Sequence, residues 1–98
     1  MKKITIIGTG YVGLVSGAGL AEFGNSVSCV DIDQEKIKNL NNGQIPIHEP
    51  GLDIIVKNNV KEGRLTFSSN IEKNIQEAKI IFIAVGTPQD EKGIVDLT

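Results

Sequence analysis

The sequence is poor in the features on which several classes of protein depend. It has one cysteine, Cys29, in 98 residues, so neither an intrachain disulfide nor a zinc site built from several cysteines can form. Cys29 lies in an apolar run, where we expect a reduced, buried thiol. The net charge is only -2, with both signs mixed along the chain. The chain therefore lacks the basic stripe that would indicate a nucleic-acid partner and the basic amphipathic segment that would indicate binding to a membrane surface.

Long apolar runs are absent as well. No stretch approaches the roughly 20 apolar residues that a membrane span requires. The basic start at Lys2 and Lys3 is followed by apolar residues, as in a secretory signal, but Gly8 interrupts the run and favours a buried first strand. We therefore expect a soluble, cytoplasmic protein. With 40% hydrophobic and 22% charged residues, and no repeat or linker, the chain fits one α/β domain.

The apolar pattern alternates strands with helices. Short β-branched and apolar runs predict strands at residues 4–7, 27–31, 65–67 and 80–85, the last being the most apolar and expected in the centre of a sheet. Helical spacing predicts a helix in each interval between them, with two in the interval that contains the prolines. This order predicts a doubly wound parallel sheet of the Rossmann type, with strand order 3-2-1-4. Because such folds usually have about six strands, we expect residues 1–98 to be an incomplete dinucleotide-binding domain.

Local signals predict which helical residues face the core and how the helices begin. Asp33 is expected to cap the second helix, and Ser69 with Glu72 has the form of a capping box for the last. Gly17 and Gly19 are expected to let the first helix approach its neighbours closely. The core-facing residues predicted from helical spacing are Leu14, Val15, Ala18, Ala21, Ile37, Leu40, Leu52, Ile55, Val56 and Val60.

Residues 8–13 form the motif Gly-x-Gly-x-x-Gly directly after the first strand and at the start of a helix. In this context Gly8 permits a tight turn, Gly10 removes a side chain that would collide with a pyrophosphate, and Gly13 allows close helix packing. The free amides around Tyr11 and Val12, at the positive end of the helix dipole, would then bind phosphates. The alternative is a turn that is rich in glycine for packing alone.

Asp31 ends the second predicted strand, where this fold places the carboxylate that accepts hydrogen bonds from the adenosine ribose. It favours NAD, because a 2'-phosphate would meet its negative charge. Asp33 is better explained as a helix cap. Lys36, one turn into the helix, either lies beside the ribose or is an ordinary solvated lysine.

Four segments together resemble the UDP-glucose and GDP-mannose dehydrogenases. They are G-T-G-Y-V-G-L at 8–14, V-D-I-D at 30–33, N-N-G-Q-I-P-I-H-E-P-G-L at 41–52 and V-G-T-P at 85–88. The first is common among dehydrogenases, whereas P-I-x-E-P-G-L followed by V-G-T-P is much more specific. The resemblance runs the whole length and is best to the UDP-glucose 6-dehydrogenases within the family.

The resemblance implies a role for each matching residue in holding NAD. The backbone of Tyr11 and Val12 would contact the pyrophosphate, Asp31 the adenosine ribose and Lys36 the same end of the cofactor. Gly86 and Thr87 would meet the cofactor from the loop after the fourth strand, where ligands sit at a reversal of strand order. A plain Thr-Pro turn is the alternative there.

The family is understood to oxidise a sugar C6 alcohol to a carboxylate with two NAD, through a thioester on a cysteine. Those catalytic groups lie beyond residue 98 in the family's order, so the resemblance implies that this stretch is inactive alone and meets its nucleotide sugar only in a full-length enzyme. Cys29, in an apolar strand, is not that nucleophile. His48, in a loop with prolines on both sides and no partner identified by the sequence, is expected to serve packing.

Other functions stay open at this stage. The substrate could be GDP-mannose, a UDP-N-acetylhexosamine or a hydroxyacyl thioester, and a different class would be a non-catalytic NAD-sensing domain such as those attached to potassium transporters. The fourth strand, lacking a neighbour, could pair with another copy and form a homodimer.

Overall fold

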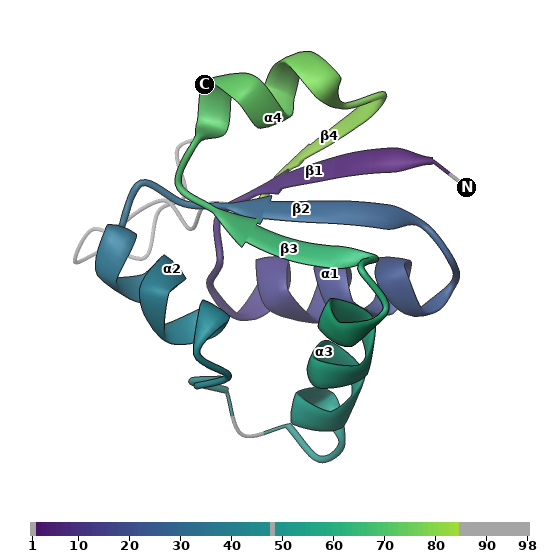
Figure 1. Ribbon diagram of the computed structural model, residues 1–98, viewed down its shortest axis with the longest axis vertical. Helices are drawn as coiled ribbons and strands as arrows, with labels where there is room; N and C mark the ends of the chain where they lie inside the picture. The colour runs from purple at the N-terminus through teal and green to yellow at the C-terminus, as the bar shows by residue number, and fades with distance from the viewer. Residues whose placement is uncertain (1, 48, 85–98) are drawn as a thin grey trace, which may run out of the picture.

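The computed structural model describes residues 2–47 and 49–84, in which strands and helices alternate (Figure 1). No helix in this part of the chain is long and apolar enough to cross a bilayer. The predicted strands are present, with ends shifted by one or two residues. The elements are β1 (Lys3–Ile7), α1 (Tyr11–Glu22), β2 (Ser26–Val30), α2 (Gln34–Asn41), α3 (Leu52–Lys61), β3 (Leu65–Ser68), α4 (Ile71–Glu77) and β4 (Ile80–Ile83).

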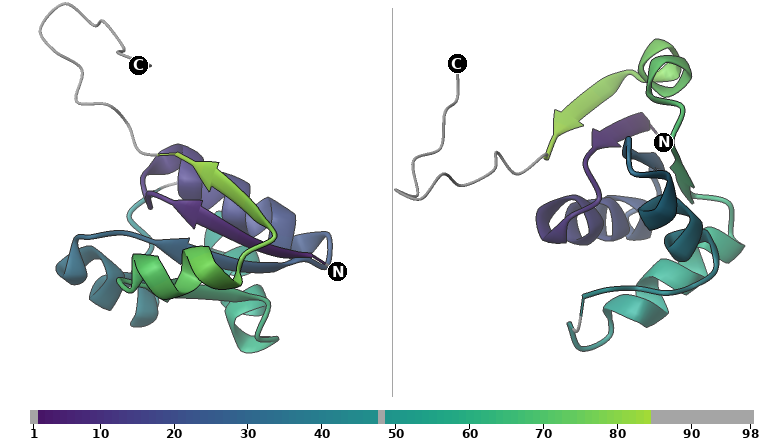
Figure 2. Two further views of the ribbon diagram at one scale, coloured as in Figure 1. Left: turned by 90° about the horizontal axis from the view of Figure 1, so that it is seen from above. Right: turned by 90° about the vertical axis from the view of Figure 1, so that its left-hand side faces the viewer.

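The strands form one parallel sheet in the order β3-β2-β1-β4, which confirms the predicted Rossmann-type arrangement. Helices α1, α2 and α3 cover one face of the sheet and α4 covers the other (Figures 1 and 2). Ile7 pairs with Val30, so β1 and β2 end side by side. The residues that follow these two strands therefore meet beyond the carboxyl ends of the strands, where this fold binds its ligands.

Helix α1 lies against the sheet most closely at Gly17. A Cβ atom there would lie 2.6 Å from the Cys29 sulfur, too close for any side chain. Gly19 has nothing within 4 Å of the equivalent position, so the prediction of close approach was wrong for this residue. Val15 was also predicted to lie in the core but is 36% exposed, because it lines an open apolar surface next to Phe82 and Ile83 of β4. The core comprises Ile4, Ile6, Leu14, Ala18, Ala21, Val27, Cys29, Ile37, Leu40, Leu52, Val56, Leu65 and Phe67.

Helix α3 buries an amide where the pattern predicted a valine. Val60 is 43% exposed, whereas Asn59 beside it is fully buried. The Asn59 side chain donates to the Ile55 carbonyl at 2.8 Å and accepts from Arg64 Nε at 2.9 Å. Arg64 Nε also donates to the Ala21 carbonyl at 3.1 Å. These bonds replace the water that the amide loses, so a polar residue takes the core position.

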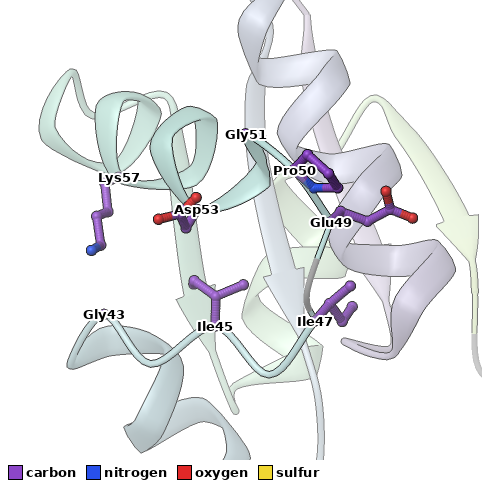
Figure 3. A pocket seen from close by; sticks show the side chains of 8 residues that line it. All are labelled: Gly43, Ile45, Ile47, Glu49, Pro50, Gly51, Asp53 and Lys57. Carbon is purple, nitrogen blue, oxygen red and sulfur yellow. The ribbon is translucent and has the colours of Figure 1, made fainter.

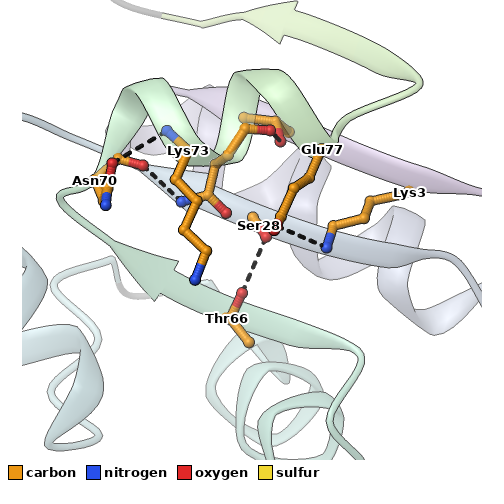
Figure 4. Close-up of polar contacts among 8 residues, drawn as sticks. Lys3, Ser28, Thr66, Asn70, Lys73 and Glu77 are labelled. Carbon is orange, nitrogen blue, oxygen red and sulfur yellow. Dashed lines mark hydrogen bonds and ion pairs between the residues drawn. The ribbon is translucent and has the colours of Figure 1, made fainter.

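Helix α4 begins one residue later than predicted, and the proposed capping box is wrong. Asn70 is the N-cap, and its side chain accepts a hydrogen bond from the Lys73 amide at 3.1 Å (Figure 4). Because Asn70 takes this role, Ser69 lies outside the helix and the third helical position is a lysine. Asp33 caps α2 as predicted, accepting from the Lys36 amide at 3.1 Å.

Strand β4 lies at the edge of the described sheet and not in its centre. Its side chains are unusually exposed for such an apolar strand, with Ile81 42%, Phe82 47% and Ile83 74% accessible. The order 3-2-1-4 itself places β4 outermost among four strands. The apolar run was correctly assigned to a strand, but its composition gave no information about whether a neighbour is present.

Candidate functional site

The turn between β1 and α1 is built by glycines, as the motif predicts. Gly8 has φ +110°, a conformation that other residues rarely adopt, and its amide donates to the Val30 carbonyl at 2.7 Å. A Cβ atom at Gly13 would lie 2.0 Å from the Gly8 carbonyl oxygen, so the helix begins directly against the turn. A Cβ atom at Gly10 would meet nothing within 4 Å. Among the described residues, protein atoms therefore leave the bend open in front of Gly10.

Helix α1 begins without the usual protection of its amides. Gly10 is the N-cap and offers no side-chain acceptor, and the first turn contains no acidic residue. The first bond of the helix runs from the Leu14 amide to the Gly10 carbonyl at 2.9 Å. The amides of Tyr11 and Val12 precede it and have no acceptor within the helix. Such amides, at the positive end of the dipole, form a site for an anion such as a diphosphate.

Asp31 lies beside this bend, directly after β2, with its side chain 14% exposed. One carboxylate oxygen, Oδ2, accepts from the Thr9 hydroxyl at 2.7 Å and from the Thr9 amide at 3.1 Å. The other, Oδ1, accepts from the Asp33 amide at 3.0 Å. The carboxylate is therefore held against the glycine turn by groups from two loops.

These contacts favour the ionised form of Asp31. Burial would raise the pKa of its carboxyl, but the hydrogen bonds from the Asp33 amide and from Thr9, with the positive charge of Lys36, together lower it below the ordinary value. Lys36 Nζ lies 3.8 Å from Asp31 Oδ2. The structure thus places two of the predicted cofactor residues, Lys36 and Asp31, beside each other.

A second contact reaches the bend from the proline-containing loop. The hydroxyl of Tyr11 donates to the Glu49 carboxylate, which raises the pKa of Tyr11 through the hydrogen bond first and the nearby negative charge second. The same loop and the start of α3 enclose a cavity of about 480 Å³ (Figure 3). This cavity is lined by Ile45, Ile47 and other residues of that segment and by none of the predicted cofactor residues.

The remaining predictions divide into one that the structure describes and three that it does not. Cys29 is buried, and burial raises the pKa of its thiol to about 12, so it is protonated at neutral pH and unsuited to act as a nucleophile. Gly86, Thr87 and His48 lie outside the described residues.

Residues 2–98 match the family described as "UDP-glucose/GDP-mannose dehydrogenase family, NAD binding domain". The chain belongs to this family. It carries the NAD-binding part of NAD-dependent nucleotide-sugar dehydrogenases, as the resemblance implied.

Individual relatives give the same result. UDP-glucose 6-dehydrogenase TuaD of Bacillus subtilis is 58% identical over 98 residues, which is 100% of this chain and 21% of that protein. UDP-glucose 6-dehydrogenase of Rhizobium meliloti is 56% identical over 86 residues, 88% of this chain and 20% of that protein. The chain therefore spans about a fifth of the length of these relatives.

Solved structures of the family share the fold. A UDP-glucose dehydrogenase from Pyrobaculum islandicum superposes with a TM-score of 0.88 at 35% identity, covering 99% of this chain and 22% of that one. GDP-mannose dehydrogenase from Pseudomonas aeruginosa, in a ternary complex, gives 0.86 at 38% identity, covering 96% and 22%.

Sequence reasoning missed two residues at the bend, Thr9 and Glu49. Thr9 was treated as a spacer between glycines, although a hydroxyl residue beside a carboxylate-bearing strand end was a usable signal. Glu49 belongs to the quoted P-I-x-E-P-G-L segment, but its approach to Tyr11 depends on how the loop folds back, which no local pattern specifies.

Proposed function

We propose that this chain is the NAD-binding part of a UDP-glucose 6-dehydrogenase, which oxidises UDP-glucose to UDP-glucuronate with two NAD. One observation carries the cofactor assignment: the uncapped amides of Tyr11 and Val12 open beside the fixed carboxylate of Asp31. The amides would hold the pyrophosphate and the carboxylate the adenosine ribose, with Lys36 at the same end. Gly86 and Thr87 would complete the site from the loop after β4. Bound NAD supplies the acceptor for hydride.

The substrate assignment rests on degrees of similarity. Two bacterial relatives named UDP-glucose 6-dehydrogenase reach 58% and 56% identity. Among the solved structures, the UDP-glucose, GDP-mannose and UDP-N-acetyl-mannosamine dehydrogenases have 35%, 38% and 35%, so the assignment rests on the two bacterial relatives. GDP-mannose and UDP-N-acetyl-mannosamine remain the alternative substrates. Assay of the longer enzyme with all three nucleotide sugars tests the choice, and faster turnover of either alternative than of UDP-glucose would contradict it.

The preference for NAD over NADP follows from the charge of Asp31. A 2'-phosphate would be placed against a carboxylate that is negatively charged at neutral pH, so NADP should bind more weakly. Calorimetric titration of the chain with each cofactor tests this. Equal affinity for the two would overturn the role of Asp31.

The variant Asp31→Ala should weaken NAD binding by about tenfold or more, since hydrogen bonds to charged groups are among the stronger ones. It should also reduce the difference between the two cofactors. Asp53→Ala is the matched control, because Asp53 is an exposed carboxylate in the first turn of another helix, α3. Its affinity for NAD should equal that of the unmodified chain.

We further propose that the chain is inactive alone and that its copies pair through β4. The nucleophile and the residues that assist it are expected in the remaining four fifths of the family's length, so NAD and UDP-glucose together should yield no NADH with this chain.

Edge strands with unpaired backbone groups readily join a second chain. Analytical ultracentrifugation should show dimers that Ile83→Lys removes, since Ile83 is 74% exposed and a charge there opposes pairing. Only monomers at high concentration would contradict the pairing.

A further inference from the structure

Thr9 is a buried polar residue placed at the centre of the candidate cofactor site. It is 1% exposed, although it lies in a turn between two glycines. Both of its hydrogen-bond donors serve the same atom: the hydroxyl and the amide donate to Asp31 Oδ2 at 2.7 Å and 3.1 Å. The backbone amide would be there with any residue at this position, so the hydroxyl is the contribution specific to threonine.

The donors around Asp31 leave its two oxygens unequal. A carboxylate has about four acceptor positions, two on each oxygen. On Oδ2 both positions are taken by Thr9, and the Lys36 ammonium nitrogen lies 3.8 Å from the same oxygen. Oδ1 accepts one bond, from the Asp33 amide at 3.0 Å. Among the contacts of the described residues, the remaining acceptor position therefore belongs to Oδ1.

We propose that Thr9 is a positioning residue for cofactor recognition: its hydroxyl holds Asp31 Oδ2 against the glycine turn, and so presents Oδ1 to the ribose of the dinucleotide. This proposal rests on the proposed NAD site. It also gives a reason for the fixed orientation of the carboxylate before any ligand binds. A carboxylate that is already oriented loses less conformational freedom when it binds the ribose, which favours affinity.

The variant Thr9→Val tests the hydroxyl, because valine keeps the shape of threonine and replaces the donor by a methyl group. Thr9→Ser keeps the hydroxyl and should behave like the unmodified chain. Thr5→Val is the matched control: Thr5 is also fully buried, and its hydroxyl also donates one bond, to the Asn74 carbonyl at 2.8 Å. That bond lies on the α4 side of the sheet, away from Asp31. Both valine variants thus lose one buried hydrogen bond.

The first readout needs no ligand. Carboxyl NMR titration of Asp31 should give a higher pKa in Thr9→Val, because a bond to the ionised form is lost. Thr9→Ser and Thr5→Val should leave this pKa unchanged. The other charged groups near the carboxylate, Lys36 and Asp33, are the same in every variant. An unchanged pKa in folded Thr9→Val would show that the hydroxyl does not hold the carboxylate, and would overturn the proposal.

The second readout is the affinity for NAD and for NADP. Thr9→Val should bind NAD about tenfold more weakly and lose part of its preference over NADP, whereas Thr5→Val should keep both. An equal loss for both cofactors would indicate a structural role and contradict positioning. If the unmodified chain binds neither cofactor, the proposed function fails at the level of this chain, and the carboxyl titration still decides whether Thr9 orients Asp31.

Discussion

Two helices of this domain begin in a similar way but offer different surroundings to a ligand. Both α1 and α3 follow a glycine, Gly10 or Gly51, that provides no side-chain cap. The first turn of α1 contains no acidic residue, whereas that of α3 contains Asp53, whose charge occupies the positive end of the dipole. Beside the start of α1, the Asp31 carboxylate is held by Thr9 and by the Asp33 amide. The two helix starts therefore differ in the charged groups around them, and the proposed nucleotide site depends on that difference.

The glycines themselves differ in what a side chain would cost, and Gly13→Ala should have the largest effect on stability. Its Cβ atom would lie 2.0 Å from a backbone oxygen, so the turn or the helix must move. We expect a loss of about 3 kcal/mol in the free energy of unfolding, as in severe overpacking. Gly51→Ala, at φ +83° with open space around it, should lose only about 1 kcal/mol. Urea denaturation measures both, and equal losses would contradict the described contact.

The variant Gly10→Ala separates binding from stability. No atom lies within 4 Å of the new methyl group, so the midpoint of unfolding should stay the same or rise slightly. A bound pyrophosphate would occupy that space, so NAD affinity should fall about tenfold or more. Undiminished affinity, measured by calorimetry, would show that the diphosphate does not approach this face of the turn.

The smallest expected effect concerns the link between the two helix starts. Tyr11 opens α1, and Glu49 lies three residues before α3. Tyr11 is the only tyrosine and the chain has no tryptophan, so tyrosinate absorbance reports this contact alone. Because the bond to Glu49 stabilises the neutral phenol, the titration midpoint should lie above that of a free tyrosine.

Glu49→Gln should lower that midpoint towards the free value, since it removes the negative charge. Glu62→Gln, on the far end of α3, is a control that should leave it in place. A midpoint that does not respond to Glu49→Gln would mean that the loop is not attached to α1 in solution.

The fold was predictable because each strand is a short apolar run and the segments between the strands carry helix signals: amphipathic periodicity in α2 and α3, and flanking glycines in the weakly periodic α1. The positions of the glycine turn and of Asp31 were predictable for a similar reason, since both directly follow a predicted strand, β1 or β2. The pattern did not specify which of two neighbouring residues of a helix faces the core. In α3 the buried residue is Asn59 and not Val60, because Arg64 and the Ile55 carbonyl satisfy the hydrogen bonds of the buried amide. Thr9 and Glu49 depend on contacts between loops, which periodicity does not encode.

The central claim is that a dinucleotide's diphosphate rests on the first amides of α1. Amide NMR during titration with NAD measures this residue by residue. The account predicts the largest shifts at Tyr11, Val12 and the neighbouring Thr9, with little change at Leu52 and Asp53 at the start of α3. Shifts confined to α3 and the cavity beside it, with the amides of α1 unmoved, would contradict it.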